Sequence, residues 1–130
     1  MDVDDAGEAY RRGVKELGLS KELLGISLAV AASRIYIAGE NLAYALVKKA
    51  NGSSSRDHGK LWRAVRELYE RGVLKKDYRP ALEMSYRLRV KGDYGRDVGP
   101  GAELSKSSVQ SQIATLEEFR LEVQRVVCGK

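Results

Sequence analysis

A proline-free stretch from Lys21 to Ala50 limits the folds open to this chain. It contains only two glycines, and an apolar residue occupies nearly every second position. With no helix breaker inside it, such a stretch forms one long helix that ends at the turn sequence NGSSS. Apolar side chains lie on more than one of its faces, among them Ile26, Leu28, Val30, Ile35, Ile37, Ala38, Leu42 and Leu46. Because a helix of this kind is covered from several sides, we predict that it is central.

Two shorter helices are expected, one before this stretch and one after it. The residues after the acidic start predict a first helix that ends near Gly18, with Ser20 as the N-cap of the long helix. The loop that follows the long helix consists of turn residues, and Asp57 or a nearby serine can cap a helix over about 58–71. Gly72 then stops that helix.

Two more helices complete the pattern. Pro80 suits the first turn of a helix that runs to about Tyr94, after which GRDVGPGA is an evident break. A last helix is expected from about Glu103 to Val127. No segment alternates with period two over a useful length, so we expect no sheet. The sequence therefore predicts an all-α fold, an up-and-down bundle of about five helices in a single domain over residues 1–130.

Composition excludes several classes of protein. Cys128 is the only cysteine, so an intrachain disulfide and a cysteine metal cluster are excluded and a reducing, intracellular setting is expected. The N-terminus is acidic, unlike a signal peptide, and the longest apolar run is too short for a bilayer span. We expect a cytoplasmic protein without membrane contact. The chain has no P-loop, dinucleotide fingerprint or metal-ligand spacing, so we expect neither a cofactor nor a metal.

Positive charge is concentrated in the middle of the chain. Residues 48–91 hold 13 Lys and Arg against five Asp and Glu, whereas the net charge of the whole chain is +5. Such a segment attracts phosphate groups, although solvated helix faces have the same composition. Trp62 is a candidate for base stacking, but its place beside Leu61 and Val65 favours packing in the core. Around it lies a candidate basic patch of Lys60, Arg63 and Arg66.

Polar residues interrupt the apolar stripes of two helices. On a helical wheel Tyr86, Arg89 and Asp93 follow Leu82 on the inward side, and Arg89 and Asp93 have the spacing of an ion pair. Arg34 falls among apolar residues of the long helix, with Asn41 below it. These groups can be satisfied structural residues that set the register of the helices, or they can form a pocket for phosphate or RNA. Inward polar groups and an apolar long helix also predict a homodimer.

Three segments of the sequence, in this order, resemble one known family. SRIYIAGENLAYALVKKANG, RDHGKL and YRLRVKGDYG are similar to segments of the HEPN family (higher eukaryotes and prokaryotes nucleotide-binding domains), in particular its small stand-alone prokaryotic members. The resemblance covers roughly residues 20 to 127. Its motifs place matching residues at Ser33, Arg34, Tyr36, His58, Arg89, Asp93 and Tyr94, with Ile37 and Gly92 departing from the family's tyrosine and alanine.

The resemblance implies a helical bundle, often dimeric, that binds nucleotides or RNA or pairs with a minimal nucleotidyltransferase in toxin–antitoxin systems. Its matching residues, together with Asn41 from the helical wheel, make Arg34, Asn41, Arg89, Asp93 and Tyr94 the candidate ligand-binding residues. Many members of the family also cleave RNA without a metal, and they do so through an R-x4-6-H motif.

This chain lacks that motif. His58 is its only histidine, and positions 51 to 53, where the arginine belongs, are Asn51, Gly52 and Ser53. Histidine is the usual general acid or base near neutral pH, so we expect a binding protein rather than an enzyme. Two alternatives stay open: an endoribonuclease in which His58 acts with an arginine brought close by the fold, and a structural module that binds a protein partner. A histidine at a helix start is more often a cap or a surface group.

Overall fold

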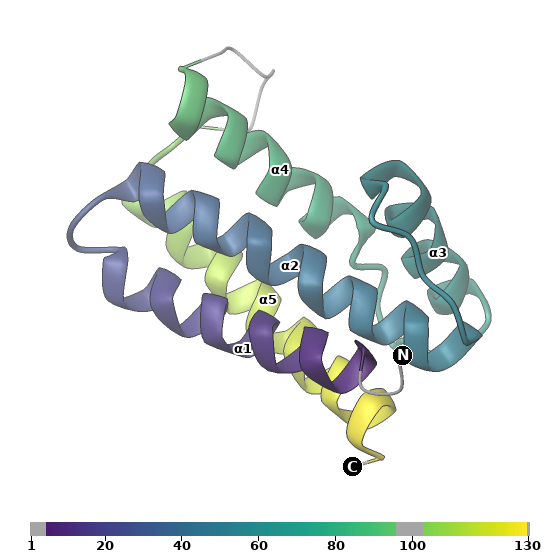
Figure 1. The fold of residues 1–130 in the computed structure, drawn as a ribbon. Coiled ribbons are helices and arrows are strands. Elements are labelled where there is room, and N and C mark those ends of the chain that lie inside the picture. Colours follow the sequence, from purple (N-terminus) through teal and green to yellow (C-terminus); the bar gives the residue numbers. More distant parts are fainter. Residues whose placement is uncertain (1–4, 96–102, 130) are drawn as a thin grey trace.

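A computed structural model describes residues 5–95 and 103–129, except for the side chains of Asp5 and Tyr94. The described residues form helices and their links and contain no strand, which confirms the predicted all-α bundle. The longer helices run alongside one another, and the short third helix packs at one end, as Figure 1 shows. The helices are α1 (Asp5–Leu23), α2 (Leu28–Asn51), α3 (His58–Glu70), α4 (Arg79–Tyr94) and α5 (Lys106–Cys128).

The helix α2 is the centre of the bundle, as predicted. It contacts each of the other four helices. Its side chains at Ile35, Leu42 and Leu46 are fully buried, and small residues such as Ala31 and Ala38 let neighbouring helices approach. At Gly39 the approach is close, because a Cβ atom there would lie 3.0 Å from Leu82 of α4. The apolar residues around α2 thus bury the faces of several neighbours at once.

The boundary between the first two helices differs from the prediction. Ser20 does not begin α2: it lies inside α1, fully buried, and its hydroxyl donates to the carbonyl of Leu17 at 2.6 Å. The chain turns after Leu23, and the N-cap of α2 is Ser27, whose hydroxyl accepts from the backbone N–H of Val30 at 3.2 Å. Gly18 therefore did not end the first helix, since a glycine inside a helix lowers its stability without breaking it.

The remaining helices begin and end close to the expected positions. Asp57 caps α3, with its carboxylate accepting from the backbone N–H of Lys60 at 3.0 Å. Pro80 lies in the first turn of α4. The last helix begins three residues after the expected Glu103, because Ser105 and Ser108 form a reciprocal capping box at its start.

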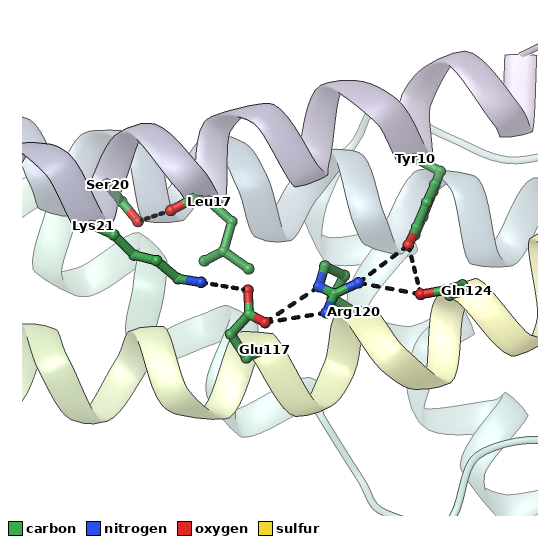
Figure 2. A network of polar contacts seen from close by, with 7 residues as sticks. All are labelled: Tyr10, Leu17, Ser20, Lys21, Glu117, Arg120 and Gln124. Carbon is green, nitrogen blue, oxygen red and sulfur yellow. Dashed lines mark hydrogen bonds and ion pairs between the residues drawn. The ribbon is translucent and has the colours of Figure 1, made fainter.

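A polar network joins α1 to α5 along their shared surface (Figure 2). Glu117 accepts from Lys21 at 3.0 Å and from Arg120 at 3.2 Å. Burial opposes ionisation of Glu117, but the hydrogen bonds from Lys21 and Arg120 outweigh it and lower the pKa of this carboxyl. Arg120 also donates to Gln124 at 3.1 Å, and Tyr10 donates to the same amide oxygen at 3.1 Å. The side chains of this network bond to one another across the two helices, so the network holds α1 against α5.

None of the described helices combines the length and the apolar character needed to cross a membrane.

Candidate functional site

The structure brings side chains of α2, α3 and α4 together where these three helices pack against one another. We call them the aromatic–arginine cluster: Tyr36 and Glu40 of α2, His58 and Trp62 of α3, and Tyr86 and Arg89 of α4.

His58 is the most accessible aromatic group of this cluster. It is the first residue of α3 and is exposed, while Asp57 before it provides the cap. Its ring stacks on Trp62, one turn further along α3, with a centroid distance of 4.7 Å and an interplanar angle of 21°. Tyr86 of α4 lies 4.9 Å from the same imidazole ring. Two aromatic neighbours from two helices therefore fix the orientation of an exposed imidazole.

Trp62 belongs to the core, as its place beside the Leu61 and Val65 stripe predicted. Only 8% of its surface is exposed, and its indole N–H donates to the carboxylate of Glu40 at 2.8 Å. With one face against His58, Trp62 is not itself available to a nucleobase. The stacking surface that the cluster offers to solvent is the imidazole of His58.

Glu40 is the acidic centre of the cluster. Burial raises its pKa, against the hydrogen bond from Trp62, the positive charges of His58 and Arg56, and a hydrogen bond from Tyr36. Its carboxyl group thus lies within electrostatic reach of His58 and Arg56. Neither sequence periodicity nor the family resemblance pointed to Glu40.

Arg89 forms the predicted ion pair with Asp93, at 3.2 Å. Its guanidinium also lies 4.8 Å from the centre of the Tyr36 ring, which in turn is 5.7 Å from Tyr86. The pair is less buried than the helical wheel indicated, because 34% of the Arg89 side chain and 31% of the Asp93 side chain are exposed. Arg89 is therefore held in place and still open to an anionic ligand.

Arg56 is a second arginine at this site, and the sequence analysis missed it. Its guanidinium lies 3.7 Å from the centre of the Tyr44 ring and donates to the side-chain oxygen of Asn41 at 3.3 Å. The amide of Asn41 donates to the carbonyl of Ile37 at 2.9 Å, so the predicted ligand residue Asn41 serves to position Arg56. Arg56 is exposed, and its place directly before the cap and histidine of α3 is the signal that could have identified it.

Arg34 lies elsewhere. Its guanidinium pairs with Glu16 of α1 at 3.1 Å, and 40% of the Arg34 side chain is exposed. It therefore ties α1 to α2 and does not share the apolar surroundings expected from the wheel. The side chain of Tyr94, another predicted ligand residue, lies outside the described residues.

The candidate basic patch is spread over the outer surface of α3. Lys60, Arg63 and Arg66 are all exposed, on the helix that carries His58 and Trp62. Arg66 pairs with Glu70 at 3.5 Å and with Asp77 at 3.3 Å, so part of its charge is neutralised. Within the described residues, no group of three or more His, Cys, Asp or Glu side chains is arranged to hold a metal ion.

Comparison with known proteins adds no relative. No family model matches the sequence, and no curated protein matches it either.

Proposed function

We propose that the protein binds single-stranded RNA or a nucleotide through the aromatic–arginine cluster. One observation carries this proposal: contacts through the rings of Tyr86 and Tyr36 connect the exposed imidazole of His58 with the accessible guanidinium of Arg89. Flat rings bind nucleobases by stacking, and guanidinium groups bind phosphate oxygens. Together these groups match the two chemical parts of a nucleotide.

The surrounding charge supports the same ligand. Arg56 lies beside the cluster, next to Glu40 and Asn41, and the basic residues of α3 follow on the outer surface. Positive charge of this density accelerates the approach of a polyanion and makes its binding depend on salt. The similarity of three sequence segments to HEPN domains points the same way, and we include membership of that family, with a cytoplasmic location, in the proposal.

Fluorescence anisotropy with labelled oligonucleotides tests this function. We expect His58→Ala and Arg89→Ala each to weaken RNA binding by about 1–3 kcal/mol, and Arg89→Ala also to reduce the salt dependence. Lys15→Ala, which removes one exposed charge from α1, is the matched control and is expected to bind as the wild type does. Unchanged binding by both cluster variants, with thermal unfolding like that of the wild type, would refute the assignment.

A second candidate is metal-independent cleavage of RNA. The observation that favours it is the placement of an exposed imidazole near a carboxyl group with a raised pKa, with Arg56 close to the same carboxyl. A histidine and a carboxyl can share the acid and base roles in attack by a 2′-hydroxyl. Incubation of RNA with the protein in a chelator tests this. Cleavage that His58→Ala abolishes supports it, and absence of cleavage leaves binding alone.

A minimal nucleotidyltransferase is the protein partner that the HEPN resemblance implies. A stable complex with such a partner that survives His58→Ala and Arg89→Ala, from a chain that binds no RNA, would replace the RNA proposal with that of a partner-binding module.

A further inference from the structure

A pocket of about 340 Å³ opens between the end of α3 and the start of α4, outside the aromatic–arginine cluster. Three arginines line it: Arg66 from α3, and Arg79 and Arg87 from α4. The carboxylates of Asp77 and Glu83 lie in the same wall. The positive groups outnumber the negative ones, so the pocket suits an anion better than a cation.

Asp77 organises this pocket more than it occupies it. One of its carboxylate oxygens pairs with Arg66 at 3.3 Å, and the other accepts from the backbone N–H of Arg79 at 3.0 Å. Through these two contacts the carboxylate of Asp77 joins the end of α3 to the start of α4. Arg66 also pairs with Glu70, so its side chain is held in place on one side of the pocket. The arginines that α4 contributes to the lining are Arg87 and the half-buried Arg79.

The pocket and the cluster both lie where α3 packs against α4. The two helices pair in antiparallel order, since His58 near the start of α3 contacts Tyr86 late in α4, and Arg66 late in α3 contacts Asp77 before α4. Arg66 follows His58 by two turns of α3, which is about 12 Å of helix. Arg79 precedes Tyr86 by nearly two turns and lies on the same side of α4. Aromatic groups thus lie toward one end of the α3–α4 contact, and arginines lie toward the other.

We propose that the surface along the α3–α4 contact, the α3–α4 surface, binds the backbone of a single-stranded RNA, with a base on His58 and a phosphate further along the strand in the arginine pocket. The proposal rests on the RNA-binding function proposed above and extends it by a second contact point. The separation of the two ends is larger than the distance between the base and the phosphate of one nucleotide. The pocket therefore contributes to binding of an oligonucleotide and not to binding of a mononucleotide.

The test compares a nucleoside monophosphate with an RNA of about six nucleotides. We expect Arg79→Ala to weaken binding of the oligonucleotide about tenfold, the effect of losing one charge-assisted hydrogen bond, and to reduce the slope of log K against log salt by about one. Binding of the monophosphate should not change. Glu83→Gln, which removes a negative charge from the pocket, should strengthen oligonucleotide binding about twofold.

The outcomes separate this inference from the function on which it rests. If the wild type binds the oligonucleotide and Arg79→Ala binds it equally well, binding along the α3–α4 surface is refuted. The proposed binding at the aromatic–arginine cluster then stands. If Arg79→Ala weakens binding of both ligands equally, the α3–α4 surface is also refuted as a second contact point, since the pocket would then act through the cluster. If the wild type binds neither ligand, both proposals fail. Lys15→Ala again controls for net charge, and thermal unfolding shows that each variant is folded.

Discussion

Glu40 shows how a single buried carboxyl can set the electrostatics of this site. It accepts a hydrogen bond from Trp62 and lies within reach of the charges of His58 and Arg56, yet burial is the strongest influence and its pKa is raised. The folded protein therefore binds a proton at Glu40 at a pH where the unfolded chain, with a pKa near 4.5, has released it. Protonation of Glu40 and stability of the fold are linked.

The sign of this linkage gives a prediction. Because the folded pKa is raised, the stabilising contribution is fully present below pH 4.5 and is lost as the pH rises through the folded pKa. The variant Glu40→Gln keeps an oxygen acceptor for Trp62 and cannot titrate. We expect the free energy of unfolding of the wild type, relative to Glu40→Gln, to fall as the pH rises from about 4.5 and then to level off.

Urea denaturation at a series of pH values measures this difference. The comparison is repeated in a His58→Gln background, which removes the neighbouring imidazole from both proteins. A difference that stays flat across the series, or that grows in favour of the wild type with rising pH, would contradict the role given to Glu40.

The residues of the site differ in how far the sequence could identify them. Asp93 lies four residues after Arg89 on one helix, so spacing alone predicted their ion pair, which the structure confirms. Glu40, Arg56 and Tyr86 come together only through packing of α2, α3, α4 and the loop before α3. Such long-range contacts depend on the angles between helices, which periodicity does not determine.

At the level of elements, the start of α2 shows why helix boundaries are harder to predict than helices. Ser20 and Ser27 both precede apolar periodic residues, so both have the sequence signature of an N-cap. The structure uses Ser27, because the chain turns at residues 24–26 and the apolar side of α1 continues through the buried Leu17 to Ser20. Packing against α2 and α5 extended α1 beyond Gly18.

The two serines should accordingly respond differently to substitution. Ser27→Ala leaves the backbone N–H of Val30 without its acceptor and should lower the free energy of unfolding by about 1 kcal/mol. Ser20→Ala removes a hydroxyl that donates to a helical carbonyl and adds a better helix former, so we expect a change within about 0.5 kcal/mol. Urea denaturation of both variants checks this pair. A larger loss for Ser20→Ala than for Ser27→Ala would place the cap where the sequence first indicated it.

For the whole molecule, the pattern of apolar residues was enough to predict a bundle of about five helices around a central one, and the structure confirms it. The structure gives less support to the two sequence features from which a homodimer was predicted. One ground was the set of inward polar groups, yet Arg34 pairs with Glu16, Asn41 with Arg56, and Arg89 with Asp93 within one chain. The other was the apolar surface of α2, most of which the other four helices cover. Neither ground requires a second copy.

A small apolar patch remains at the turn between α1 and α2. Ile26 is 79% exposed and Val30 is 42% exposed, an unusual position for two branched apolar side chains. Stable interfaces bury roughly 800 Å² on each partner, far more than two side chains provide. We therefore expect self-association through this patch to be weak. Light scattering should give a mass near 14.4 kDa in dilute solution that increases with concentration. The variant Ile26→Ser, at a position outside the core, should stay monomeric over the same range. A constant dimer mass in dilute solution, or equal association of the variant, would show that another surface joins the chains.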